Sequence, residues 1–226
     1  MTQTGSAPSA TASVSSPRGD ARALLAAGAA AGPLFLGAGV IQGLSREGFD
    51  FTRNAISQLG LGALGWIQMT SFALTGTLII AGAIGMRRVL SGGPGGVRVP
   101  WLVGVFGASF LLCGVFAADA GAGFPAGTPQ EAAGSLSAHG VVHMLGGMIG
   151  FLAWCVASFM LARVFAARGQ RGWVLACRLV PAGILAGFAG SSATVLAFTA
   201  GAGLGLLWLT AVFARLFITA PAPRLL

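Results

Sequence analysis

Six apolar stretches in this chain are each long enough to cross a lipid bilayer as an α-helix. A helix needs about 20 predominantly apolar residues to cross a hydrocarbon core of roughly 30 Å. Because lipid offers no hydrogen-bond partners, a segment that crosses it must satisfy its backbone N–H and C=O groups internally, as a helix does. The sequence therefore predicts an all-α, polytopic integral membrane protein, a bundle of six transmembrane helices at residues 21–44, 65–86, 101–122, 139–165, 173–198 and 201–218.

The composition supports a membrane protein and excludes a nucleic-acid partner. Hydrophobic residues make up 55% of the 226 positions, charged residues only 8%, and the mean hydropathy is +0.85. The formal net charge of +8 comes from arginines spread among the ends of apolar stretches. Proteins that bind nucleic acids gather such residues on one face instead. We therefore expect the lipid bilayer to be the main partner; the sequence indicates no oligomeric state.

Arginine placement predicts the orientation in the membrane. The cytoplasmic loops of membrane proteins are enriched in Lys and Arg. Eleven of the 13 basic residues, all arginines, lie before or at the start of the first span, at or after the end of the last span, or in and around the second and fourth connections. Only Arg46 and Arg53 lie on the other side. Both termini are therefore predicted to be cytoplasmic, in a multi-pass protein of the plasma membrane.

The regions outside the spans are short. Residues 1–20 are rich in Ser, Thr, Ala and Pro and have no apolar periodicity, which predicts a disordered cytoplasmic tail. Residues 21–44 are longer than the apolar part of a signal peptide, about 7 to 15 residues, so we expect a retained first span. The membrane domain is predicted at residues 21–220, followed by a short cytoplasmic C-terminus at residues 221–226.

Small residues four positions apart predict close contacts between helices. Without a hydrophobic driving force between helices in lipid, association depends on packing, and glycine lets two backbones approach closely. Such pairs occur in four of the predicted spans, at Gly28 and Gly32, Gly146 and Gly150, Gly183 and Gly187, and Gly201 and Gly205.

Polar side chains gather in the first outer connection. Its residues 48–60 predict a short interfacial helix, with Phe49, Phe51, Ile56 and Leu59 toward lipid or the bundle. Three-residue spacings would place the polar side chains near one another as a candidate binding surface. Alternatively, they form the solvated face of an amphipathic helix with a weak ion pair. These side chains are Asp50, Arg53, Asn54 and Ser57.

The second outer connection predicts a helix start at Thr128. Thr128 would be the N-cap, Pro129 would occupy the first helical position, and Glu131 would complete a capping box. This structural role takes Glu131 out of the catalytic candidates.

His139 and His143 are the only histidines, and their spacing places them on one face of a helix. Such a pair suits two ligands of one zinc or other divalent metal ion, with Asp119 as the third and Asp50 or Glu47 as alternatives to it. The pair could instead hydrogen-bond to neighbouring helices or handle protons. Two haem ligands from one helix face are disfavoured, because they cannot bind opposite sides of a porphyrin. We expect no cofactor, with a divalent metal as the alternative.

Asp119 is the strongest single candidate for a catalytic residue. The segment AADAGAG places its carboxylate among small and apolar residues near the end of a span. A partner such as Arg53 or a histidine would offset the cost of burying that charge, whereas a position just beyond the helix end would expose it to water.

Three stretches together resemble a known family. They are FDFTRNAISQLGLGALGWIQ before the second span, GFPAGTP followed by SAHGVVH, and the closing GLGLLWLTAVFARLF. In this order they resemble the bacterial and archaeal membrane proteins grouped as domain-of-unknown-function family 998, over roughly residues 21–217. The resemblance implies a compact six-helix bundle with no assigned activity. It draws attention to Asp50, Arg53, Asn54, Ser57, Phe124, Pro125, His139 and His143, and the chain departs from the family pattern at Gln58, where an acidic residue is expected.

Two classes of function fit these residues. The first is binding of a lipid, an isoprenoid or another lipid-soluble small molecule, with Arg53, Asn54, Ser57 and Phe124 as its contacts. The second is an intramembrane enzyme with Asp119, Asp50, His139 and His143 as catalytic candidates. It would be either a metal-dependent hydrolase or an acid-initiated cyclase or lyase of an isoprenoid. A transporter is disfavoured, because no span has a charged residue near its middle and the halves show no repeat.

Overall fold

Six long helices and two short 3-10 turns make up a computed structural model that describes residues 17–93, 95–131 and 134–220. Each of the six long helices has the length and apolar composition needed to cross a membrane, as the sequence predicts. In chain order the elements are α1 (Pro17–Ser45), η1 (Ile56–Gly60), α2 (Gly65–Leu90), α3 (Arg98–Val115), α4 (Ala138–Ala167), α5 (Arg171–Ala189), η2 (Gly190–Ser192) and α6 (Val195–Thr219).

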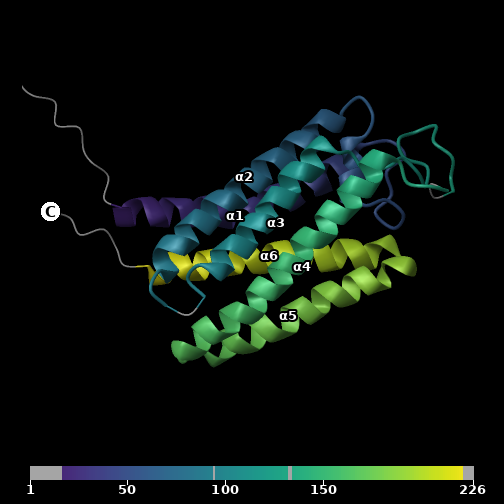
Figure 1. Cartoon of the computed structure of the whole chain (residues 1–226). Coiled ribbons are helices and arrows are strands. Elements are labelled where there is room, and N and C mark those ends of the chain that lie inside the picture. Colours follow the sequence, from purple (N-terminus) through teal and green to yellow (C-terminus); the bar gives the residue numbers. More distant parts are fainter. Residues whose placement is uncertain (1–16, 94, 132–133, 221–226) are drawn as a thin grey trace, which may run out of the picture.

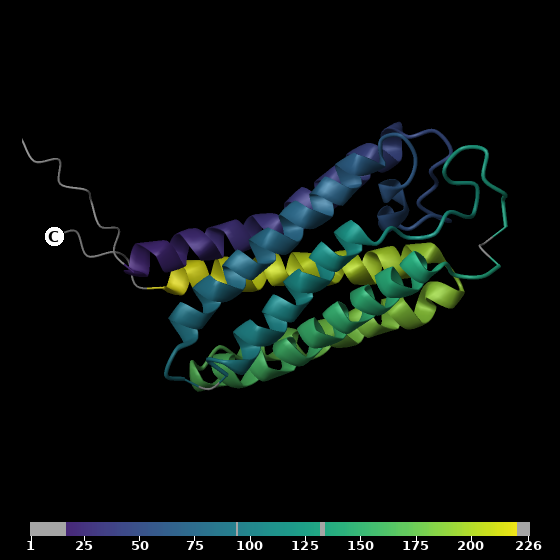
Figure 2. The ribbon, with the colours of Figure 1, turned by 45° about the horizontal axis from the view of Figure 1, so that its top comes forward.

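The six helices form a closed ring. Each packs against the next in sequence, and α6 returns to pack against α1. At this closure Arg22 donates a hydrogen bond of 3.0 Å to the carbonyl of Ala220 and lies over the ring of Phe217. Figures 1 and 2 show α1 and α6 side by side.

The connections divide the bundle into two ends. Residues 46–64, residues 116–131 and the α5–α6 turn lie together at one end, which we call the loop end (Figures 1 and 2). The α2–α3 and α4–α5 connections lie at the other end, with the start of α1 and the close of α6. We call it the arginine end, because most of the arginines lie there.

Glycines allow the closest approach between helices, as their spacing predicts. A Cβ atom placed at Gly28 would lie 2.8 Å from the Cα of Gly82 and 2.8 Å from the ring of Phe213. Between α5 and α6, a Cβ at Gly187 would lie 2.7 Å from the Cα of Gly201. Only a residue without a side chain fits at such contacts.

Three helix boundaries differ from the predicted spans by six residues or more. Helix α3 ends at Val115 rather than at residue 122, because Phe116 takes an extended conformation and the chain enters the second loop. Helix α5 ends at Ala189 rather than at residue 198, and α6 begins at Val195 rather than at residue 201. The side chain of Thr194 caps α6 by accepting a hydrogen bond from Leu196 N–H, which favours a helix start there.

Helix α1 begins at Pro17, inside the predicted tail, and proline suits the first helical position. The rest of the predicted tail and the predicted C-terminal segment, residues 221–226, lie outside the described residues.

The prediction of a helix at Thr128 is wrong. Residues 128–131 form bends without helical hydrogen bonds, and the Thr128 hydroxyl donates to the carbonyl of Pro125 instead of capping a helix. Helix α4 begins ten residues later, where Ser137 is the N-cap and accepts a hydrogen bond from Gly140 N–H at 3.0 Å.

The predicted interfacial helix at residues 48–60 is present only as η1, over its last five residues. Upstream, the Asp50 carboxylate accepts hydrogen bonds from the backbone N–H and the hydroxyl of Thr52, and the Asp50 carbonyl accepts one from Asn54 N–H. Such local side-chain bonds offer the backbone an alternative to a helix. The first loop therefore turns sharply before η1.

Candidate functional site

Asn54 joins the two loops at the loop end. Its side chain is 0% exposed, and its Nδ2 group faces the carbonyl oxygens of Gly121 and Ala122 at 3.3 and 3.4 Å. Nδ2 also lies 3.3 Å from Gln58 Oε1, and Oδ1 accepts a hydrogen bond of 3.0 Å from Asp50 N–H. Residues 46–64 and 116–131 are thus fastened through one buried amide, and we call this assembly the cap.

Gln58 adds a second connection between the loops. Its Oε1 accepts a hydrogen bond from Ala55 N–H at 3.1 Å, and its Nε2 donates to the Asp119 carbonyl at 3.1 Å. An amide can both accept and donate in this position, whereas an ionised carboxylate can only accept. This dual role gives a physical reason for glutamine at the position where the family resemblance implies an acid.

This geometry predicts that Gln58→Glu destabilises the cap. The introduced carboxylate cannot donate to the Asp119 carbonyl and would face that oxygen as a second acceptor. We expect the free energy of unfolding in detergent to fall by about 2 kcal/mol. Gln130→Glu is the matched control. Its side chain faces a positively charged donor and not a carbonyl oxygen, because Arg53 donates to Gln130 Oε1 at 2.7 Å.

Thermal unfolding of both variants checks the prediction. At the exposed Arg53 contact the same amide-to-acid change should alter stability by less than about 0.5 kcal/mol. Equal losses in the two variants would show that Gln58 does not need its N–H donor.

The carboxylate of Asp119 lies in the second loop, beyond the end of α3, and holds the start of α4. It accepts hydrogen bonds from the backbone N–H of Ser137 at 2.9 Å and from the Ser137 hydroxyl at 2.6 Å. A helix N-terminus favours a nearby negative charge. A Cβ atom at Gly140 would overlap this carboxylate, so the first turn of α4 needs glycine there.

Asp50 and Arg53 have different partners, although both belong to the predicted polar surface. Hydrogen bonds from the hydroxyl and then the N–H of Thr52 lower the pKa of the exposed Asp50 carboxyl, and the charge of Arg53 adds a smaller effect. The Arg53 guanidinium itself donates to the carbonyl oxygen and to the side-chain Oε1 of Gln130. Arg53 therefore connects the first loop to the second and does not pair with Asp119.

Phe124 is a buried anchor of the cap. Its side chain is almost fully covered, in edge-to-face contact with Phe49, and the Arg46 guanidinium lies 4.9 Å from its ring centre. Arg46 also donates hydrogen bonds of 2.6 Å to the carbonyls of Leu59 and Leu61. The arginine thus fixes the C-terminal end of η1 while it covers the aromatic ring.

The two histidines lie in different environments. His139 is exposed, with its ring in edge-to-face contact with Phe116. His143 is only 6% exposed, and its Nδ1 lies 2.7 Å from the Phe116 carbonyl oxygen at the end of α3. Because a carbonyl can only accept, Nδ1 carries a proton in this contact, and in the neutral form of the ring Nε2 is then an acceptor.

The predicted ligand set of His139, His143 and Asp119 is not brought together around one point. Each of the three side chains has its own partners, given above. Within residues 17–93, 95–131 and 134–220, no group of three or more His, Cys, Asp or Glu side chains is arranged to hold a metal ion.

A cavity of about 500 Å³ lies beneath the cap, inside the ring of helices. Residues of η1 and the turn before it form one wall, and the other walls come from all six long helices. Phenylalanine is the most frequent lining residue, with six members, Phe35, Phe72, Phe110, Phe151, Phe188 and Phe198. None of the lining residues is charged.

A few polar groups line this apolar cavity. Among the predicted site residues, Ser57 and His143 line it, whereas Asp50, Arg53, Asn54, Asp119 and Phe124 belong to the cap. Thr199 also lines it, and the buried hydroxyl of this residue has no hydrogen-bond partner in the described part of the chain.

Sequence reasoning missed several glutamines and one threonine. Gln58 and Gln130 complete the cap, and Gln42 donates a buried hydrogen bond of 2.7 Å to Gln68 between α1 and α2. Gln42 and Gln68 each follow an isoleucine near the end of a predicted span. An amide side chain inside an apolar stretch is the sequence feature that indicates a buried hydrogen bond between helices. Thr199 falls between the spans predicted at residues 173–198 and 201–218, so the sequence does not place it on the wall of a cavity.

A family model described as "Protein of unknown function (DUF998)" matches residues 29–220. No curated protein and no solved structure matches the chain. The family match runs from within α1 to the end of α6. This six-helix membrane protein therefore belongs to the DUF998 family.

Proposed function

We propose that this protein binds a lipid-soluble molecule with a hydroxyl group, such as an isoprenoid alcohol, in the cavity beneath the cap. The observation that carries the proposal is an apolar cavity inside the membrane domain, with one buried histidine held at its wall. Ligand cavities are typically apolar, with a volume of about 300–1,000 Å³ and a few placed polar groups. The cavity of about 500 Å³ has these properties.

His143 supports an alcohol rather than a plain hydrocarbon. Its Nδ1–H is engaged by the Phe116 carbonyl, which fixes the ring and leaves Nε2 to accept a hydrogen bond from the ligand. The unpartnered hydroxyl of Thr199 offers a second hydrogen-bonding group. A hydroxyl group in the ligand would satisfy these groups at a depth where water is scarce.

Entry from the lipid is supported by methionines on α4. Met144 and Met148 line the cavity, and their side chains are also 52% and 46% exposed. Within a transmembrane helix such exposed positions face lipid. Methionine side chains adapt readily to different shapes, so these two residues form a suitable edge for a ligand that arrives laterally.

Binding without catalysis is favoured over the acid-initiated enzyme. A cyclase needs a proton donor against the substrate, and none of the cavity-lining residues is an Asp or a Glu. Asp119 instead binds Ser137 at the start of α4. The aromatic lining fits an apolar ligand equally well in a binding protein.

Native mass spectrometry with farnesol as the probe tests the proposal. Gly147 lines the cavity, and a Cβ at this position would meet no atom within 4 Å, so Gly147→Leu should fill the cavity without a clash. Wild type should bind one farnesol per chain and Gly147→Leu should lose it. Gly104→Leu is the matched control, because Gly104 is equally open but lies outside this cavity.

His143→Phe tests the polar contact. It keeps an aromatic ring and removes the acceptor nitrogen, so we expect farnesol to bind about fivefold more weakly, the effect of one hydrogen bond of about 1 kcal/mol. Binding of the hydrocarbon farnesene should be unchanged. Equal farnesol binding by wild type and Gly147→Leu would overturn the proposal, and Gly203→Val provides a second cavity-filling variant.

A further inference from the structure

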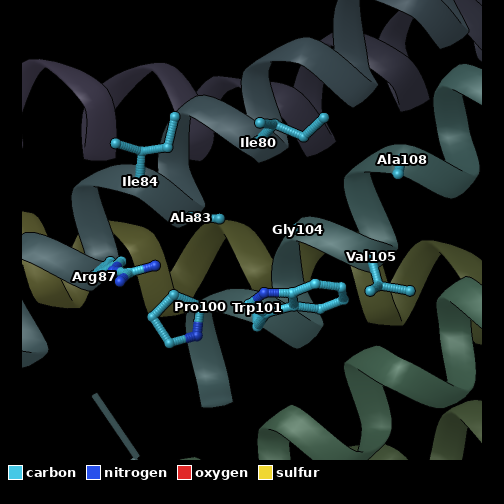
Figure 3. A pocket seen from close by; sticks show the side chains of 9 residues that line it. All are labelled: Ile80, Ala83, Ile84, Arg87, Pro100, Trp101, Gly104, Val105 and Ala108. Carbon is cyan, nitrogen blue, oxygen red and sulfur yellow. The ribbon is translucent and has the colours of Figure 1, made fainter. Parts of the chain in front are cut away.

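A groove of about 300 Å³ runs along the surface between α2 and α3 at the arginine end (Figure 3). Its walls come from Ile80, Ala83, Ile84 and Arg87 of α2 and from Pro100, Trp101, Gly104, Val105 and Ala108 of α3. Small residues, Ala83, Gly104 and Ala108, keep the space between the two helices open. The groove faces the membrane, because Ile84 and Trp101 are 47% and 66% exposed.

One end of the groove is positively charged. Arg87 is exposed and lies at the end of the groove near the close of α2 (Figure 3). No hydrogen bond or ion pair engages its guanidinium within the part of the chain that the structure describes. Arg88 and Arg98, on either side of the same connection, add positive charge around it. An unpaired guanidinium beside an apolar groove is complementary to an anion with a hydrocarbon chain.

Trp101 indicates the depth of this site in the membrane. Tryptophan favours the boundary between hydrocarbon and headgroups, where the phosphates of lipids lie close by. Trp101 is in the first turn of α3, and Pro100 lies between it and Arg87 in Figure 3. Its indole N–H has no acceptor among the described residues and can donate to a phosphate oxygen.

We propose that this groove binds one anionic phospholipid from the leaflet at the arginine end. Arg87 and the indole N–H of Trp101 hold the phosphate, and one acyl chain lies along Ile84, Gly104 and Val105. This site is separate from the cavity beneath the cap, with which it shares no lining residue.

Native mass spectrometry of the full chain with added phosphatidylglycerol tests this site, with phosphatidylcholine as the zwitterionic reference. Wild type should retain one phosphatidylglycerol more tightly than phosphatidylcholine. Arg87→Gln should weaken this lipid about fivefold. Arg88→Gln is the matched control, because the same change is made one position along α2, outside the groove.

Filling the groove separates this proposal from general attraction to arginine. Gly104→Leu and, as a second variant, Ala108→Leu should displace phosphatidylglycerol, whereas Gly147→Leu should leave it bound. Equal weakening by Arg87→Gln and Arg88→Gln, or undiminished binding in both groove-filling variants, would contradict the site. Farnesol binding is read in the same samples, so each proposal stands or fails independently.

Discussion

Asn54→Asp is expected to open the cap and to lower the free energy of unfolding by about 3 kcal/mol. The change keeps the size of the side chain but replaces its N–H donor with a carboxylate oxygen. That oxygen would face the carbonyls of Gly121 and Ala122 in a site where Asn54 is fully buried. A buried charge among acceptors has no compensating partner, so the two loops should separate.

Trypsin gives a local measurement of this opening. Arg46 and Arg53 are the arginines of the first loop, and both are held by hydrogen bonds in the closed cap. Purified Asn54→Asp should be cut after these residues much faster than wild type. Thr52→Ala is the control, because it removes only an exposed hydrogen bond to Asp50. Wild-type cleavage kinetics in Asn54→Asp would show that Asn54 does not fasten the loops.

Gly28→Val is expected to have the second large effect, on assembly of the ring. The first carbon atom of the new side chain would lie 2.8 Å from both the Gly82 Cα and the Phe213 ring. Relief requires α1 to move away from α2 and α6 together, because the obstacles belong to both helices. We expect a loss of about 3 kcal/mol or more, at the upper end of overpacking effects.

Gly37→Val is the matched control for this change. Gly37 lies on the same helix, and a Cβ atom there would meet no atom within 4 Å. Size-exclusion profiles and thermal unfolding should show a defect for Gly28→Val and near wild-type behaviour for Gly37→Val. Similar behaviour of the two variants would mean that this three-helix contact does not limit packing.

Much of the fold could be predicted because the membrane imposes simple rules on the sequence. Apolar length alone predicts six spans, and glycines four positions apart predict close contacts such as that of Gly28 with Gly82. Helix ends were harder to place. Residues 190–194, GSSAT, are a short break between two long apolar stretches, so hydropathy places the turn several residues too late, and the local signals for it are this Gly-Ser-Ser run and the capping side chain of Thr194.

The candidate site was predictable only in part. The sequence draws attention to His143 and Ser57. That both line one cavity depends on how η1 and α4 are placed relative to each other in the fold, which the sequence does not show. The spacing of His139 and His143 does not reveal that one ring is exposed and the other is bound to Phe116. Gln58 is equally hidden, because its role depends on a loop some sixty residues away, through the Asp119 carbonyl.

Photolabelling in native membranes tests the cavity most directly. Membranes that contain the full chain would be irradiated with a farnesol analogue carrying a diazirine, and labelled residues would be identified by mass spectrometry. We predict labels on α4 near Met144 and Phe151 and on α6 near Phe198, with loss of these labels in Gly147→Leu. Labels confined to lipid-facing residues such as Ile41 and Leu44, or an unchanged pattern in Gly147→Leu, would contradict a ligand site beneath the cap.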